Sequence, residues 1–293
     1  MAPTAHRLAL PIAILLSAFP AWAAESPDAP AGLRPSAPAE SAMKAVSPER
    51  VRHDIDTLAA FGTRHTLSDT ISPTRGIGAA RNWLQSQFAA VPGVKVEMES
   101  FEQAPVERMP KGGTIVNVIA TIPGSGSPQA ASRRIYALGH YDSMPTDKMD
   151  PTSDAPGAND DASGVVVLLE AARVLAAAHL DSTIVLVATA GEEQGLLGAK
   201  HRALAAAEAH ENIPAVLNFD IVGDPSPAFN GKPGPHDKIV RVYSEGLPNW
   251  PRPLGRWRGC TGIITKLWCM PPVPETRRRR TYGGSKSRWR ANI

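Results

Sequence analysis

Apolar residues follow two spacings along the middle of the chain, and segments with the two spacings alternate. Helical spacing, with apolar positions three or four residues apart, begins after Ser47-Pro48-Glu49 and Ser72-Pro73 and returns over 162–178 and 196–210. Between these segments lie alternating or continuously apolar runs that predict strands: 94–98, 114–122, 135–139, 182–190 and 215–219. This order predicts an α/β fold, with three α/β/α layers around a mostly parallel central sheet.

Length and composition fit a folded domain with an unusual C-terminal segment. The chain has 293 residues, 43% of them hydrophobic, which excludes a disordered or a small disulfide-stapled protein. Residues 250–293 hold 11 of the 31 Lys and Arg residues and only one of the 28 acidic residues, Glu275. The four arginines at 277–280 predict no nucleic-acid partner, because a charge run this short is usually only solvated.

The first residues have the pattern of an export signal. Arg7 precedes the apolar run Leu8–Phe19, and Ala21-Trp22-Ala23 then fits a signal-peptidase site. We expect a signal peptide at 1–23, an exported protein in the periplasm or outside the cell, and no stable membrane span after cleavage. The alternatives are an uncleaved anchor or a buried helix. The Pro- and Ala-rich residues 24–45 predict a flexible linker.

Polar, metal-competent residues follow the predicted core strands. They are His140 and Asp142, then Asp160 and Asp161 in a loop before a helix, then Glu192 and Glu193, and finally Asp220. In open α/β sheets the functional site lies beyond the carboxyl ends of the strands. Taken singly, an Asp before a helix is usually a cap and a Glu pair is usually a solvated turn. Their shared position at strand ends favours a common site.

Such a cluster of carboxylates repels itself unless a cation neutralises it. Carboxylates with one imidazole suit zinc or a similar divalent ion. Asp142, two residues after His140, could orient the imidazole. Adjacent Glu192 and Glu193 leave the strand end in different directions, so one can bind a metal while the other acts as a base. This division predicts metal-assisted hydrolysis.

Four motifs in this region resemble those of a known family. They are GHYDS (139–143), GANDDASG (157–164), ATAGEEQGLLGA (188–199) and LNFDIVGD (217–224). Their order and spacing are similar to those of the co-catalytic zinc exopeptidases, which include secreted bacterial aminopeptidases, glutamate carboxypeptidase and the transferrin-receptor ectodomain. The segment AAFGTRHTLS (59–68) resembles the N-terminal signature of this family. The resemblance covers residues 46–249, which we expect to form a partial domain of the zinc-exopeptidase fold.

The resemblance implies two zinc ions per domain and a set of ligands for them. His140 and Asp220 would bind the first zinc, Asp160 would bridge both ions, and Glu193 would bind the second. The family also has a second histidine late in the chain, and this sequence has none after His236. The second zinc site is therefore expected to be incomplete here.

The resemblance also implies a mechanism. Glu192 would be the general base, Asp142 would orient His140, and peptides would be the substrates. Asp161 is expected to cap the following helix and not to bind metal.

Residues 250–293 lack the periodic pattern that the family's fold would need at its C-terminal end. Their Arg, Trp, Cys and Pro enrichment is typical of an out-of-frame translation of GC-rich DNA. We expect a frameshift near residue 249 or a replacement of the domain's end, an incomplete C-terminus, and a basic tail that is not natively folded.

Three functions remain open at this point. The leading hypothesis is an exported aminopeptidase that is impaired by the loss of the last zinc ligand. The alternatives are a glutaminyl-cyclase-like acyltransferase on the same fold and a degenerate binding protein without catalysis. Substrate preference and oligomeric state cannot be predicted. Five further histidines between residues 46 and 220 are expected at the surface: His53, His65, His179, His201 and His210.

Overall fold

The computed structural model describes residues 36–223, 240–242 and 267–269. The predicted signal peptide, His236 and most of residues 250–293 lie outside the described residues. The helices are α1 Ala37–Ala45, α2 Pro48–Ala60, α3 Gly76–Ala89, α4 Pro128–Ala131, α5 Ser163–Leu175 and α6 Leu197–Glu208, with a short π-helical turn η1 Ala158–Ala162 before α5. The strands are β1 Lys95–Gln103, β2 Gly113–Ile122, β3 Arg133–His140, β4 Thr183–Thr189, β5 Asn212–Asn218, β6 Val240–Val242 and β7 Leu267–Cys269.

Five strands form the central sheet, in the order β1-β2-β4-β3-β5. β3 is parallel to both β4 and β5, while β2 is antiparallel to β1 and β4. The α/β prediction is confirmed, and the sheet is mixed because β2 runs against its neighbours. β3, β4 and β5 therefore end at the same edge of the sheet, which is where the predicted site residues lie.

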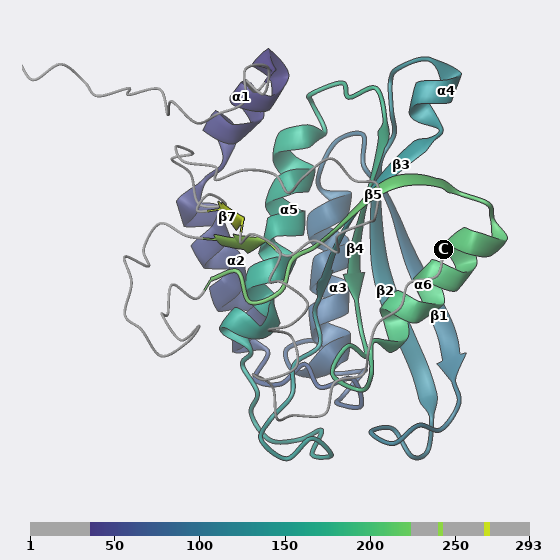
Figure 1. Cartoon of the computed structure of the whole chain (residues 1–293). Helices are drawn as coiled ribbons and strands as arrows, with labels where there is room; N and C mark the ends of the chain where they lie inside the picture. The colour runs from purple at the N-terminus through teal and green to yellow at the C-terminus, as the bar shows by residue number, and fades with distance from the viewer. Residues whose placement is uncertain (1–35, 224–239, 243–266, 270–293) are drawn as a thin grey trace, which may run out of the picture.

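Helices cover both faces of this sheet (Figure 1). On one face, Phe88 of α3 and Leu168 of α5 belong to the same fully buried cluster as Leu186 of β4. A smaller buried cluster, which includes Tyr136 and Val187, lies on the other face, where α6 is placed. All seven residues of β4 are buried because it is the central strand. Its continuous apolar sequence is typical of a strand that is covered on both faces.

Helix boundaries agree with the capping signals at one predicted start and differ at the other. Ser47 caps α2, and its hydroxyl accepts a hydrogen bond from Arg50 N at 3.2 Å. The start predicted at Ser72-Pro73 is early, because the Ser72 hydroxyl closes a turn by accepting from Arg75 N. α3 begins at Gly76, where φ is +88° and a side chain would be strained.

The segment 24–45, predicted as a linker, is helical over its last nine residues. α1 occupies Ala37–Ala45, and the hydroxyl of Ser36 caps it by accepting from Ala39 N at 3.4 Å. Ala42 is the buried residue of this helix, so the helix packs against the domain through a small apolar contact.

A buried carboxylate ties α2 to α5. Glu170 of α5 is fully buried, and it accepts hydrogen bonds from Ser47 N at 2.8 Å and from the guanidinium of Arg50. Arg173, one turn further along, donates to Asp54 of α2 at 2.6 Å. These bonds fix the first long helix over the helix that follows the predicted site.

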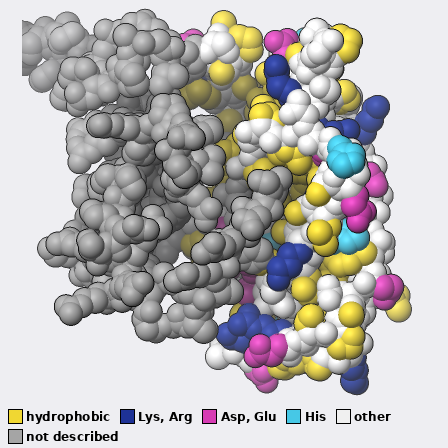
Figure 2. All heavy atoms as spheres, turned by 45° about the vertical axis from the view of Figure 1, so that its right-hand side comes forward, with side chains coloured by type: hydrophobic (Ala, Val, Ile, Leu, Met, Phe, Trp, Pro, Cys, Tyr) yellow, Lys and Arg dark blue, Asp and Glu magenta, His cyan; other side chains and the backbone are white. Residues whose placement is uncertain are grey.

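In Figure 2, hydrophobic, acidic and basic side chains are interspersed on the coloured part of the surface, so the described residues on that side carry no extended field of one charge. The exposed apolar side chains include Leu204 on α6 and Val216 on the edge strand β5. Among the described residues, no helix combines the length and apolar character that a membrane span requires.

We expect Glu170→Gln to destabilise the fold by about 1–3 kcal/mol at neutral pH, because Arg50 loses a buried charged partner. Burial alone would raise the pKa of Glu170, but the hydrogen bonds from Arg50 and Ser47 lower it below its usual value. The stabilisation is therefore present above the unfolded-state pKa of about 4.3 and is lost as the pH falls through the folded-state pKa.

Urea unfolding at several pH values measures this effect. The wild type should lose stability on acidification more steeply than the variant. Glu97→Gln, at an exposed position of β1, is the control and should match the wild type. Equal unfolding midpoints for Glu170→Gln and the wild type at neutral pH would contradict the assignment.

Candidate metal centre

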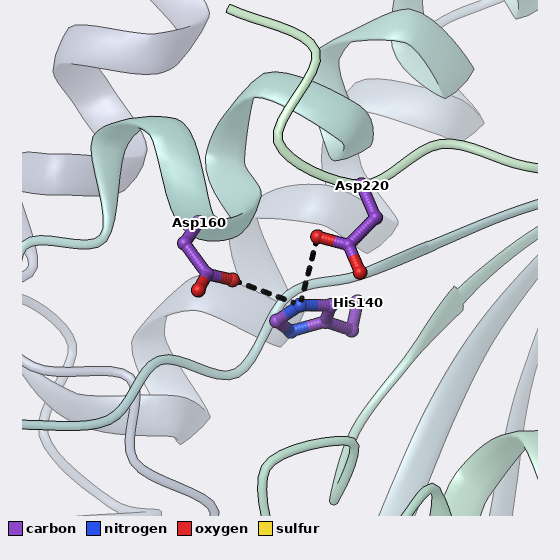
Figure 3. A group of neighbouring side chains, drawn as sticks. All are labelled: His140, Asp160 and Asp220. Carbon is purple, nitrogen blue, oxygen red and sulfur yellow. Dashed lines mark ion pairs between the residues drawn. The ribbon is translucent and has the colours of Figure 1, made fainter. Parts of the chain in front are cut away.

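Three of the predicted ligands meet at the edge where the parallel strands end. His140 is the last residue of β3, Asp160 lies in the turn η1, and Asp220 follows β5. One ligand atom from each residue lies within 4.8 Å of the other two. The three side chains point toward one another in Figure 3. His140 Nε2 is 3.1 Å from Asp160 Oδ1 and 3.9 Å from Asp220 Oδ1. The structure thus brings these residues together, while their role as ligands stays a prediction.

The orientation of His140 is set by the main chain of Asp142. The ring Nδ1 lies 3.0 Å from the main-chain oxygen of Asp142 and 3.6 Å from its carboxylate Oδ1. A carbonyl oxygen only accepts hydrogen bonds, so Nδ1 carries the proton and Nε2 is the nitrogen that faces Asp160 and Asp220. Asp142 therefore orients the imidazole as expected, but through its carbonyl group.

The carboxylate of Asp142 has a different task. It is fully buried and accepts hydrogen bonds from Glu192 N at 3.3 Å and Glu193 N at 3.2 Å. The Thr66 hydroxyl donates a third bond to it, at 3.1 Å. Asp142 consequently holds the loop that carries the predicted base against the strand that carries His140.

Glu192 and Glu193 lie outside the group of three ligand atoms, but their charges interact with it. Burial raises the pKa of Glu193, the carboxylates of Asp160 and Asp142 add to the rise, and His140 lowers it; together these effects bring the pKa to about 7. Burial also raises the pKa of Glu192 above its usual value, with Asp142 and Asp220 adding to the rise. Both side chains are therefore more basic than a solvated glutamate.

Asp161 forms a second buried anchor beside the metal ligands. It is fully buried and accepts hydrogen bonds from Gly164 N at 2.8 Å, His140 N at 3.1 Å and Ile221 N at 3.2 Å. The N-cap residue of α5 is Ala162 and not Asp161 as predicted, but the Asp161 carboxylate still accepts a first-turn N–H of this helix, from Gly164. The other two bonds join β3 to the segment after β5. Gly164 is required here, because a Cβ would lie 2.4 Å from the main-chain oxygen of Phe219.

The structure also contains buried polar residues that the sequence did not single out. Arg64 is fully buried, and its guanidinium donates to the main-chain oxygens of Tyr141 at 2.7 Å and Gly157 at 2.9 Å, and to others. The surface prediction is wrong for His65, which is fully buried; its Nε2 lies 3.1 Å from the main-chain oxygen of Lys148. No periodic pattern marks these positions, and their motif AAFGTRHTLS was the available signal.

The chemistry of this site fits a zinc ion. One imidazole nitrogen and two carboxylate oxygens converge, which is a three-ligand set with room for a fourth ligand. Burial alone would lower the pKa of His140, but the nearby carboxylates of Asp142, at 3.6 Å, and Asp160, at 3.1 Å, outweigh it and raise the pKa to about 12. The field of the surrounding carboxylates therefore favours a positive charge at this point, as a divalent cation would supply.

The sequence of this region matches a known family. Residues 117–248, which include His140, Asp160 and Asp220, match Peptidase family M28. This segment of the chain is therefore a domain of that family. This match confirms the family resemblance that the four sequence motifs indicate.

The chain is also similar to a protein from Pyricularia oryzae that is named a probable zinc metalloprotease. The two are 44% identical over 218 residues, which cover 72% of this chain and 42% of that protein. The chain thus spans less than half of the length of this curated relative.

Solved structures share the fold of this M28 domain. A Porphyromonas gingivalis glutaminyl cyclase has a TM-score of 0.51 at 23% identity, covering 61% of this chain and 62% of that one. An aminopeptidase from Aneurinibacillus sp. strain AM-1 has a TM-score of 0.51 at 17% identity, covering 63% of this chain and 72% of that one. At these identities the likeness concerns the fold alone.

We expect the 293-residue chain to bind one zinc ion tightly. His140, Asp160 and Asp220 provide three ligands for it, whereas a second ion would have only Asp160 and Glu193, two carboxylates without an imidazole. Metal analysis after extensive dialysis measures the stoichiometry. His140→Ala should release the tight ion, while His53→Ala, at an exposed position of α2, should retain it. Two tightly held ions in the wild type would contradict this prediction.

Proposed function

We propose that this protein is a zinc-dependent exopeptidase, namely an aminopeptidase that removes N-terminal residues from peptides. The observation that carries the proposal is the convergence of His140, Asp160 and Asp220 beside the loop of Glu192 and Glu193. The family match and the zinc metalloprotease relative support the peptidase chemistry. The choice of an aminopeptidase rests on the motif resemblance.

In this proposal three residues hold one zinc ion. His140 contributes Nε2, and Asp160 and Asp220 contribute carboxylate oxygens. Zinc supplies a Lewis acid that polarises a carbonyl group and lowers the pKa of water to about 7. Asp160 and Glu193 would hold a second, weaker ion, as the family pattern implies.

Glu192 is the proposed general base. Its raised pKa makes the carboxylate a better proton acceptor near neutral pH than a solvated glutamate would be. Its main-chain N–H is bonded to Asp142, which fixes the start of the side chain relative to His140. Glu192 would accept the proton of the attacking water and return it to the leaving amine.

Export is part of the same proposal. The apolar run Leu8–Phe19 and the small residues Ala21 and Ala23 support a cleaved signal, so the peptide substrates would lie in the periplasm or outside the cell.

We predict that the protein, loaded with zinc, hydrolyses an aminoacyl p-nitroanilide with a free amino group only slowly, because the second zinc site is incomplete, and does not hydrolyse the N-acetylated form. Release of p-nitroaniline measures this difference, and a chelator should abolish the activity while added zinc should restore it. The two competing functions give other results. Formation of a pyroglutamyl product from a glutaminyl peptide would favour a cyclase, and no turnover of either substrate by zinc-loaded protein would favour a binding protein.

We predict that Glu192→Gln lowers kcat by about 10²–10⁴-fold, because the amide cannot accept the proton of water. The variant should still bind zinc, since Glu192 is not among the three converging ligands. Peptide hydrolysis and zinc content are measured on the same preparation. Glu208→Gln, at an exposed position of α6, serves as the control. An unchanged kcat in Glu192→Gln would remove this residue from the mechanism.

A further inference from the structure

Thr66 lies in the loop between α2 and α3, outside the residues that match the family, and its buried hydroxyl contacts two elements of the metal centre. The hydroxyl donates to Asp142 Oδ2 at 3.1 Å and accepts from Gly191 N at 3.1 Å. One oxygen atom therefore links the segment after β3 to the segment after β4.

The loop of the proposed base is held at three consecutive main-chain N–H groups. Gly191 N is bonded to the Thr66 hydroxyl, while Glu192 N and Glu193 N are bonded to the carboxylate of Asp142. Thr66 and Glu193 N share the same oxygen, Oδ2, of Asp142. The Thr66 hydroxyl and the two carboxylate oxygens of Asp142 therefore form one hydrogen-bond network with these N–H groups. Removing the hydroxyl affects both Asp142 and Gly191.

The segment around Thr66 is itself fixed by its neighbours. Arg64 donates to the main-chain oxygens of Tyr141 and Gly157, on either side of the metal centre. His65 lies against the main-chain oxygen of Lys148 and, at 3.4 Å, the amide of Gln194, the residue after Glu193. The hydroxyl of Thr66 is therefore presented from a rigid support.

We propose that Thr66 is a positioning residue that sets the geometry of the zinc ligands and of the general base through Asp142 and Gly191. This inference rests on the proposed zinc peptidase function. Only a group that both donates and accepts can fill the position, because Asp142 offers an acceptor and Gly191 N a donor. Serine satisfies both requirements, and valine, which has the shape of threonine, satisfies neither.

The test compares Thr66→Val, Thr66→Ser and a matched control in the full chain. Thr183→Val is the control, because Thr183 is also buried and its hydroxyl also makes two hydrogen bonds, to Ala131 O at 2.8 Å and from Gly124 N at 3.1 Å. Thr183 begins β4, at the opposite edge of the sheet from His140. Loss of the Thr183 hydroxyl should lower the stability of the fold without changing the geometry of the metal centre.

Zinc affinity, measured by competition with a chromogenic chelator, is the readout that does not depend on activity. We expect Thr66→Val to weaken zinc binding by about 10–100-fold, the usual effect of removing a support of metal ligands. We expect kcat to fall with KM little changed, because Thr66 lies behind Asp142 and not on a substrate. Thr66→Ser should restore both values, and Thr183→Val should lower the melting temperature alone.

The outcomes separate this inference from the proposed function. Wild-type zinc affinity in Thr66→Val, or an equal loss of affinity in Thr183→Val, would overturn the positioning role even if the wild type is an active peptidase. A wild type that binds zinc but hydrolyses no peptide would overturn the proposed function, while the affinities would still decide the role of Thr66. If Thr66→Val does not fold, Thr66→Ser and Thr66→Ala decide: equal zinc affinities in these two variants would overturn the proposal.

Discussion

Two fully buried carboxylates, Asp142 and Asp161, hold this site together. They accept hydrogen bonds from main-chain N–H groups of separate segments of the chain. A buried carboxylate is costly unless its oxygens are hydrogen-bonded, so each loop that supplies an N–H is fixed by that requirement. Asp142 fixes the loop of Glu192 and Glu193, and Asp161 fixes His140 and the segment that begins at Ile221. Asp160 and Asp220, two of the three predicted metal ligands, can then remain exposed.

Much of this arrangement could be predicted from the sequence, because it depends on short-range patterns. The apolar run over 182–190 indicates a strand that is buried on both faces, and β4 is the central strand of the sheet. His140 and Asp220 follow strands, and parallel strands end at one edge, so their proximity follows from topology. The mixed character of the sheet could not be predicted, because the apolar pattern of β2 does not encode its direction.

The supports of the site could not be predicted, because they depend on contacts between distant parts of the chain. Thr66 meets Asp142 across 76 residues and Gly191 across 125 residues. The histidine at 65 sits in a polar stretch, which favours a surface position, yet it is fully buried and contacts the distant residues Lys148 and Gln194. Spacing near His140 predicts that Asp142 orients the ring, but only the structure shows that the carbonyl group does so.

The buried guanidinium of Arg64 bonds main-chain oxygens and leaves the carboxylates of the predicted metal centre unpaired by it. A buried guanidinium next to several carboxylates would ordinarily pair with one of them and neutralise it. Here burial lowers the pKa of Arg64 to about 10, against the raising effect of Asp142 and two neighbouring carboxylates, and its donors are bonded to main-chain oxygens. Its charge is thus near the cluster but not bonded to it, and the oxygens of Asp160 and Asp220 stay available. In the proposed function, a zinc ion bound from solution would balance them.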